Sequence, residues 1–332
     1  MVTMHLFSCM TIRRGTVLLL IVFLALLGKF ASPRSGELLS PSSTEAQIER
    51  LFAPGRDLLD IKLAVDAMVD PSITAPKGRA AFEALAAALK ALSAEAKGSN
   101  AKLNVLRRFL TESGPWNGGR PFSYDMADPL GTNPANKLLA RYIDTRLGNC
   151  VTMPMLAMLL GRRIGLTMTL AVAPSHVFVK YTDDAGAVWN LEATSGLGFT
   201  RDVWYRRNLP MTDAAVAKGT YLRALSDEEN AALMATLLVE HHLAAKRPDE
   251  AIAAANVILR HAPRDAYVLA KRGSAYALKL RRDVIALYPD LGALPLDIRL
   301  YADGLYRNNQ ADFAAAEALG WTEREGITPS EQ

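Results

Sequence analysis

The sequence predicts an α+β fold in which a helix that bears a cysteine packs on an antiparallel sheet, followed by an all-α region. Three patterns predict it. Apolar residues at three- and four-residue spacing predict helices in the first third of the chain. Two β-rich runs near the middle bracket a turn and predict a hairpin. Two helical patterns follow each other closely in the last third, as in an antiparallel helix pair.

The first residues have the pattern of an export signal. Arg13 and Arg14 precede an apolar run over 16–27, which is shorter than the ~20 residues that cross a bilayer as a helix. We therefore expect residues 1–31 to be a cleaved signal peptide or, alternatively, an uncleaved N-terminal anchor, and residues 32–43 to be a linker. The expected location is exported, periplasmic or extracytoplasmic, with attachment to the inner membrane only through a retained anchor.

Charge argues against one class of partner. All four charged residues among the first 34 are basic, and removing them takes the formal net charge from +4 to zero. A neutral remainder without a basic block has no electrostatic footprint for nucleic acid. We therefore expect no nucleic-acid binding.

The cysteines are few and informative. The chain has two, and Cys9 lies within the predicted signal, so that cleavage leaves Cys150 alone. A solitary thiol in an oxidising compartment forms no internal disulfide, and is either a small buried hydrophobe or a reactive group.

The helices of the first third are interpreted as structural supports. Apolar spacing predicts them over 57–69, 78–96 and 100–111. A loop rich in glycine, proline and aromatic residues follows over 114–136, and loops of this kind often carry function. A short helix over 137–146 then leads toward the cysteine.

The next helix is predicted to start at Cys150. Residues 151–164 are nearly all apolar, so this helix should be buried, with Pro154 in its first turn and Gly165 at its end. A cysteine at a helix start lies against the positive end of the helix dipole, which favours a thiolate, and near free backbone N–H groups that can stabilise an oxyanion.

The strands supply a partner for the thiol. Strands are predicted over 167–173, 176–181 and 188–192, the last two joined by a turn. If that turn is centred on Asp184, His176 lies directly opposite Glu192, within reach of an imidazole–carboxylate hydrogen bond. Cys150 would then be the nucleophile, His176 its base and Glu192 the acid that orients the histidine.

The last third of the sequence is predicted to be helical. Helices are predicted over 227–246 and 248–261, and the spacing from Ala251 to Pro263 fits a helical repeat of about 34 residues. Gly273 and Tyr276 occupy the matching positions of a second repeat. That repeat degenerates near residues 288–290, and we expect an irregular helical tail to the end of the chain.

Three segments of the chain together resemble the core of the bacterial transglutaminase-like superfamily, in the branch that carries a C-terminal tetratricopeptide-like region. They are Arg146-Leu147-Gly148-Asn149-Cys150, Pro174-Ser175-His176-Val177-Phe178-Val179 and Asn190-Leu191-Glu192-Ala193-Thr194-Ser195-Gly196. The resemblance implies a papain-like fold over 44–215, including the N-terminal helices, and a tetratricopeptide-like region over 226–325. It also implies the roles of nucleophile, base and orienting acid for Cys150, His176 and Glu192. One departure stands out: the family commonly has aspartate where this chain has Glu192.

The remaining candidates are weaker. Beside the backbone of Cys150, four side chains are open as oxyanion donors: Trp116, Asn117, Tyr124 and Asn149. The histidines at 241, 242 and 261 have no ligand at metal-binding spacing, and no acidic loop suits calcium. We expect no metal and no cofactor, because thiol acyl transfer needs none.

These patterns predict an exported cysteine enzyme that forms a thioester on Cys150 from an amide, in a peptide or isopeptide bond, and passes it to water or to an amine. The partner would be a peptide or protein substrate. The alternative is a non-catalytic scaffold that binds a protein partner through its C-terminal helices.

Overall fold

The computed structural model describes residues 43–129 and 131–322. The predicted signal or anchor, and all of the predicted linker except its last residue, lie outside the described residues. Within these two ranges, no helix is both long enough and apolar enough to cross a membrane.

The N-terminal helices form where the apolar spacing predicts them, with ends shifted by a few residues. Asp57 begins one of them as an N-cap, because its carboxylate accepts a hydrogen bond from the N–H of Leu59 at 3.0 Å. The helices are α1 (Ser43–Glu49), α2 (Leu58–Val69), α3 (Ala75–Leu92) and α4 (Gly98–Thr111). The helix α1 was not predicted.

The central part contains two helices and two small sheets. Its helices are α5 (Leu139–Thr145) and α6 (Thr152–Arg163), and a short parallel pair joins β1 (Ser123–Tyr124) to β2 (Leu147–Gly148). The main sheet is antiparallel, in the order β3 (Thr167–Ala173), β4 (His176–Thr182), β5 (Val188–Glu192) and β6 (Gly198–Thr200). The predicted strands are confirmed, whereas β6 was not predicted.

The two faces of the main sheet contact different elements. Leu170, Val179 and Leu191 join the main core on the face that packs against the buried helix α6. On the other face, Ala171 and Phe178 form a second, smaller cluster with Tyr205. Tyr205 belongs to α7 (Asp202–Asn208), which precedes α8 (Asp213–Ala217). The alternation of side chains along a strand produces this division.

The predicted register of the hairpin is wrong, because the turn is centred one residue later than predicted. Asp183 and Ala187 close the turn through a hydrogen bond of 3.0 Å, so the loop is centred on Ala185, not on Asp184. Gly186, the last of the three loop residues, adopts the left-handed region (φ 80°), which a glycine does without strain. The ladder therefore pairs Val179 with Leu191 and ends there, so that His176 and Glu192 are not directly opposite.

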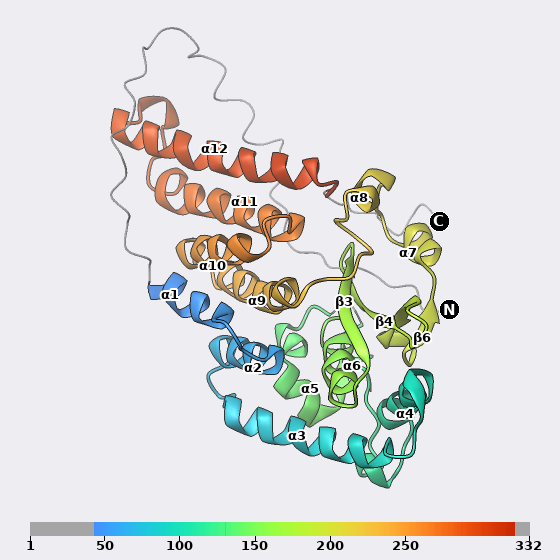
Figure 1. Cartoon of the computed structure of the whole chain (residues 1–332). Coiled ribbons are helices and arrows are strands. Elements are labelled where there is room, and N and C mark those ends of the chain that lie inside the picture. Colours follow the sequence, from blue (N-terminus) through green and yellow to red (C-terminus); the bar gives the residue numbers. More distant parts are fainter. Residues whose placement is uncertain (1–42, 130, 323–332) are drawn as a thin grey trace.

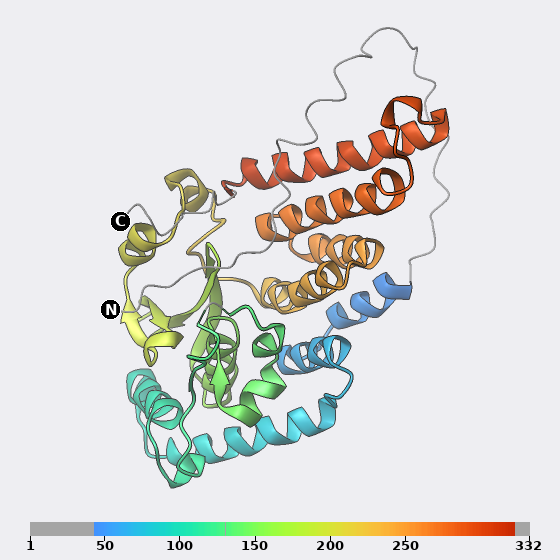
Figure 2. The same ribbon diagram turned by 180° about the vertical axis from the view of Figure 1, so that it is seen from behind.

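The C-terminal helices stack on one another and on the N-terminal helices (Figure 1). They are α9 (Asp227–Ala244), α10 (Pro248–His261), α11 (Ala266–Leu280) and α12 (Leu296–Ala318). The helix α9 packs against α2 and α10 packs against α1, so the stack continues into the first part of the chain (Figure 2). One hydrophobic core runs through both parts.

The expected irregular tail is instead the regular helix α12, of 23 residues. Gly273 permits its close packing, because a Cβ there would lie 3.0 Å from the ring of Phe313. Arg272 also binds the buried carboxylate of Asp312 through two hydrogen bonds of 2.6 and 2.8 Å. The packing of α12 therefore depends on the close contact at Gly273 and on the Arg272–Asp312 ion pair. Because neither contact needs a regular apolar spacing, the sequence pattern did not reveal the helix.

Candidate active site

Cys150 lies in the turn that leads into α6. The helix begins at Thr152, two residues later than predicted. Asn149 explains the difference: its side-chain oxygen accepts hydrogen bonds from the N–H groups of Val151 at 2.9 Å and Thr152 at 3.2 Å. The Asn149 carbonyl also accepts from Met153, so helical bonding starts at Asn149. Cys150 is thus held within the capped first turn, at the positive end of the helix dipole.

The thiol is buried and its backbone amide is unused. Cys150 is 6% exposed, and its sulfur lies 4.0 Å from the carbonyl oxygen of Ser175, the limit of a weak S–H contact. Ser175 has φ 55°, the left-handed region, in the two-residue turn between β3 and β4. Among the described residues, no acceptor binds the N–H of Cys150. That N–H is available to an oxyanion.

His176 and Glu192 are joined directly. Nε2 of His176 lies 2.7 Å from Oε2 of Glu192, and both side chains are almost fully buried. The shifted register preserves this contact, because extending the ladder pairs Glu192 with Phe178, and His176 lies two residues from Phe178 on the same face. The sequence therefore predicted the contact correctly but through the wrong pairing.

The other nitrogen of the imidazole is left for the thiol. Nδ1 of His176 is buried and has no hydrogen-bond partner in the described part of the chain. A carboxylate at Nε2 requires the proton to be on Nε2, so the lone pair of the neutral ring is on Nδ1. Nδ1 is therefore the ring atom with a lone pair left to accept a proton.

Glu192 is held by more than the histidine. Its Oε1 accepts hydrogen bonds from the N–H and hydroxyl of Thr194 at 3.1 and 2.7 Å. Its Oε2 accepts a second bond from the hydroxyl of Tyr205 at 3.0 Å. With His176, four donors therefore fix one carboxylate, which compensates for the extra methylene of glutamate relative to aspartate.

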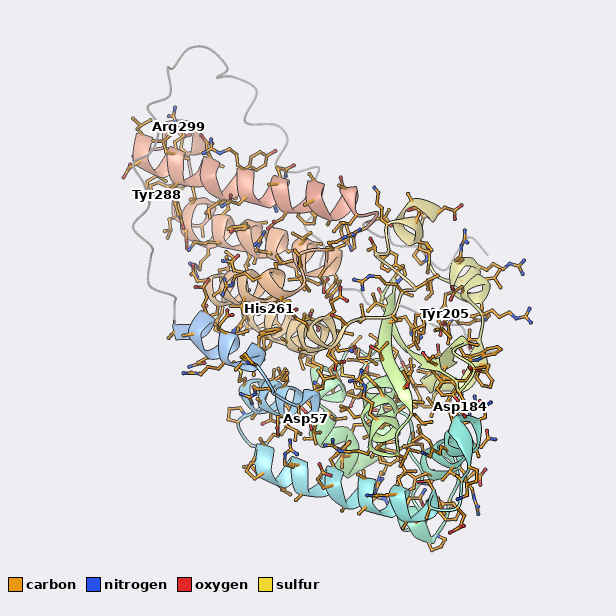
Figure 3. The ribbon with its side chains drawn as sticks, viewed as in Figure 1. Asp57, Asp184, Tyr205, His261, Tyr288 and Arg299 are labelled. Atoms are coloured by element: carbon orange, nitrogen blue, oxygen red, sulfur yellow. The ribbon has the colours of Figure 1, made fainter. Side chains whose placement is uncertain are left out.

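Sequence reasoning missed Tyr205. The residue lies on the short helix α7, beside the sheet (Figure 3), and is fully buried. Its ring stacks on Phe178 with 4.3 Å between centroids and lies 5.8 Å from the ring of His176. A tyrosine thirteen residues after the acid has no spacing signal, because a tertiary contact brings the two together. The only hint is the aromatic pair Trp204-Tyr205 in a short segment.

The electrostatics favour an ionised pair. Burial alone lowers the pKa of His176, but the neighbouring Cys150 and the hydrogen bond and charge of Glu192 outweigh it, raising the pKa from 6.5 to about 10. For Glu192, burial raises the pKa, but the bonds from His176 and Thr194 outweigh it and hold it below 4.5. Burial and the charge of Glu192 raise the pKa of Tyr205, so its hydroxyl remains a donor.

The structure sorts the four candidate oxyanion side chains. Asn117 is already used, since its amide donates to the carbonyls of Phe109 and Glu112 at the end of α4. The ring of Trp116 packs under the guanidinium of Arg108, at 4.4 Å, and its buried Nε1 has no hydrogen-bond partner among the described residues. The other two candidates lie beside the thiol.

Asn149 and Tyr124 are these two. The amide nitrogen of Asn149 is buried without a hydrogen-bond partner among the described residues. Burial and the neighbouring Cys150 raise the pKa of Tyr124 to about 12, so its hydroxyl stays protonated and donates to the carbonyl of Pro129 at 3.2 Å. Either group could supplement the Cys150 N–H.

The histidines of the C-terminal helices contact neighbouring side chains. In residues 43–129 and 131–322, no group of three His, Cys, Asp or Glu is arranged to hold a metal. His261 instead lies between two carboxylates, 2.7 Å from Glu228 and 3.1 Å from Glu49. His241 contacts Arg247.

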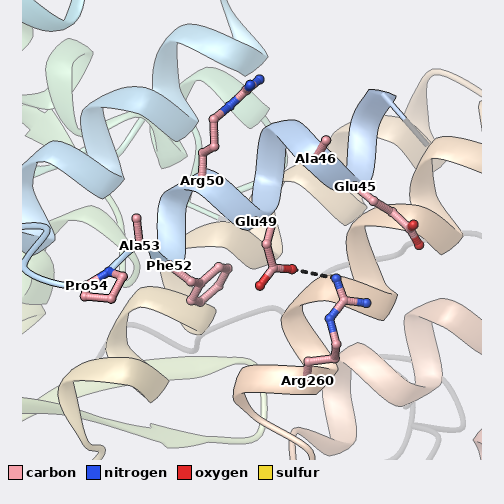
Figure 4. Close-up of a pocket in the computed structure, with 8 residues that line it drawn as sticks. All are labelled: Glu45, Ala46, Glu49, Arg50, Phe52, Ala53, Pro54 and Arg260. Carbon is pink, nitrogen blue, oxygen red and sulfur yellow. Dashed lines mark hydrogen bonds and ion pairs between the residues drawn. The ribbon is translucent and has the colours of Figure 1, made fainter. Parts of the chain in front are cut away.

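Two surface hollows lie away from the triad. One lies between α1 and α10, where Glu49 binds Arg260 across it (Figure 4). The other lies between α4 and the β5–β6 edge of the sheet. Neither is lined by Cys150, His176 or Glu192.

Comparison with known proteins identifies the central part. Residues 77–235 match a family model described as the transglutaminase-like superfamily. The match runs from α3 into α9 and includes all three residues of the triad. No curated protein and no solved structure gives a significant match. The chain therefore carries a transglutaminase-like domain followed by a helical C-terminal region.

Proposed function

We propose that this protein is an exported cysteine hydrolase or acyltransferase that acts on amide bonds, in peptides or isopeptides, through a thioester on Cys150. One observation carries the proposal. The 2.7 Å contact between His176 and Glu192 fixes the imidazole so that its unpaired Nδ1 is left for a thiol in the capped first turn of a helix. The apolar run over 16–27 supports the export of the chain.

The chemistry follows from these positions. The thiol proton passes to Nδ1 of His176, and the thiolate attacks the carbonyl carbon of the substrate. The N–H of Cys150 stabilises the resulting oxyanion, and the C–N bond breaks as His176 returns the proton to the leaving amine. Water or a second amine then attacks the thioester and releases the thiol. Hydrolysis is the first choice, and amine transfer the second.

Two finer assignments belong to the same proposal. A cysteine at the start of a buried helix, with the histidine and acid on an antiparallel sheet, supports a papain-like arrangement of the core. The antiparallel pair α9–α10, with Gly273 at the close contact of α11 with α12, supports kinship with tetratricopeptide-like repeats.

A scaffold without catalysis is the second candidate, and one observation favours it. All three residues of the triad are almost fully buried from solvent: Cys150 is 6%, His176 4% and Glu192 5% exposed. A protein partner would then bind through the C-terminal helices, which form an extended stack beside the domain (Figure 2). Intact donors and acceptors around Glu192 favour the enzyme.

Alkylation of Cys150 by iodoacetamide separates the two candidates. In a Cys9→Ser chain, Cys150 is the only thiol. For the enzyme, we expect alkylation already at about pH 6, and a loss of about tenfold or more in His176→Ala, because the imidazole maintains the thiolate. Equal rates in both proteins, each rising only at alkaline pH, would support the scaffold instead.

A further inference from the structure

A hollow lies beside the exposed edge of the main sheet. It has a volume of about 480 Å³ and is lined by two large aromatic residues, Trp189 and Phe199, and by six polar residues: Asn100, Asn104, Arg107, Asp183, Thr200 and Arg201. The two rings are 45% and 53% exposed, and their centroids are 5.4 Å apart. The indole N–H of Trp189 donates to Asp183 at 2.8 Å, which orients the ring. Large aromatic side chains left open in this way commonly mark a binding surface.

The hollow also has uncompensated positive charge. Neither Arg107 nor Arg201 has a carboxylate partner among the described residues. Nη2 of Arg107 is buried and lacks any hydrogen-bond partner in the same part of the chain, while its guanidinium lies 4.4 Å from the centre of the Phe199 ring. The one acid, Asp183, is already used by Trp189 and by the N–H groups of Ala185 and Ala187.

The strand beside the hollow is an open edge of the sheet. On the opposite edge of the sheet, the N–H groups of Leu222 and Leu225 cover β3 through hydrogen bonds of 2.9 Å. No described strand lies outside β6. Within β6, Phe199 lines the hollow and its neighbour Gly198 pairs with Glu192. An extended chain added along β6 would therefore lie beside the hollow, whose aromatic side chains are on the face of the sheet opposite to the side chain of Glu192.

We propose that the hollow is a docking site for an extended peptide, with a carboxylate at Arg107 and Arg201 and an aromatic side chain on Trp189 and Phe199. The inference adds a peptide-binding surface to the proposed function, on the face of the sheet opposite to His176 and Glu192. In an extended peptide, side chains two residues apart share one face, so a Phe-x-Glu-x-Phe pattern presents both groups together. The guanidiniums give such a peptide charge-assisted hydrogen bonds.

Fluorescence polarisation with one defined peptide tests this inference. The probe is fluorescein-Gly-Phe-Ala-Glu-Ala-Phe-Ala-amide, and the full chain carries Cys150→Ser so that no turnover occurs. We expect saturable binding that weakens about tenfold in Arg201→Ala and about fivefold in Trp189→Ala. Replacing the glutamate of the probe by glutamine should weaken binding about tenfold. Arg307→Ala and Leu296→Ala, on the distant and exposed face of α12, should leave it unchanged.

The outcomes separate this inference from the catalytic proposal. No saturable binding, or binding that ignores both Arg201→Ala and Trp189→Ala, overturns the peptide site. Quenching of Trp189 by chitotetraose without peptide binding overturns it in favour of a carbohydrate site. Each of these results leaves His176-dependent alkylation of Cys150 intact if the catalytic proposal is correct, whereas loss of that dependence alone contradicts only the chemistry.

Discussion

The hydroxyl of Tyr205 lies 3.0 Å from Oε2 of Glu192, the oxygen that also accepts from His176. The acid is therefore oriented from outside the hairpin that carries it, by a helix that sequence patterns do not reveal. Because the tyrosine stays protonated, it donates to the carboxylate at every pH at which the protein would work. In the proposed mechanism it positions the acid and does not touch the reacting atoms.

Tyr205→Phe should remove one hydrogen bond to Glu192 and leave no cavity in the core. The ring and its stacking on Phe178 remain, and one hydrogen bond to a buried carboxylate is lost. We expect the free energy of unfolding to fall by about 1 to 2 kcal/mol. Alkylation of Cys150 at pH 7 should slow by about three- to tenfold. Tyr221→Phe is the matched control, since Tyr221 packs against the same cluster. Equal effects of both substitutions would contradict a positioning role.

The Glu192 carboxylate should stabilise the fold within one pH window. The pKa of His176 is raised from 6.5 to about 10, so its contribution is complete below 6.5 and is lost as pH rises toward 10. The pKa of Glu192 is lowered, so its contribution is complete above 4.5 and is lost as pH falls through the folded-state value. The stability difference between wild type and Glu192→Gln should peak between these limits in urea unfolding. A difference that does not vary with pH would argue against the ion pair.

Gly148→Ala should displace the thiol. A Cβ at this position would lie 2.6 Å from the ring of Tyr142 and 2.7 Å from the hydroxyl of Thr152, the residue that begins α6. We expect a loss of about 1 to 3 kcal/mol in stability, together with slower alkylation of Cys150. Gly304→Ala, in α12, meets no atom within 4 Å and should be neutral or stabilising in the same thermal unfolding assay. An unchanged rate of Cys150 alkylation in Gly148→Ala would contradict the prediction that the thiol is displaced.

A buried ion pair should anchor the segment before the cysteine. Lys62 binds Asp66 at 2.7 Å and the carbonyl of Lys137 at 2.8 Å, and Asp66 accepts from the N–H of Ala140 at 2.9 Å. Lys62→Met leaves the buried carboxylate uncompensated, and we expect a loss of about 3 to 5 kcal/mol in urea unfolding. The double variant Lys62→Met/Asp66→Leu should recover part of this loss. A double variant that loses the sum of both single effects would contradict the coupling.

Local patterns predicted the elements, and tertiary contacts decided the details. Helical spacing placed α2 to α6 and α9 to α10, and the turn residues placed the hairpin, because these signals depend on neighbours in sequence. The register was missed because the three-residue loop is 184–186, closed by Asp183 and Ala187, one residue later than a turn centred on Asp184. The shift moved the pairing by two positions along the strand, which kept His176 and Glu192 on one face, so the predicted contact survived.

The missed features share a physical cause. The strand β6 has three residues, too few for an alternating pattern, and α12 is fixed by Gly273 and the Arg272–Asp312 pair with little apolar surface. Tyr205 reaches Glu192 only through the packing of α7 on the sheet. Such contacts depend on the folded arrangement and leave no spacing for a sequence pattern to show.

The most direct test of the central claim is the trapping of the thioester itself. The Cys9→Ser chain is mixed with p-nitrophenyl acetate, a small acyl donor suited to a site with little exposure, and followed by p-nitrophenol release and intact mass. We predict a burst of p-nitrophenol and one acetyl adduct on Cys150 that hydroxylamine removes, as a thioester requires. The adduct should be absent in Cys150→Ala and should form about a hundredfold or more slowly in His176→Ala. Acetylation of Cys150 at the same rate in His176→Ala would contradict the account, because the thiol would then react without the histidine.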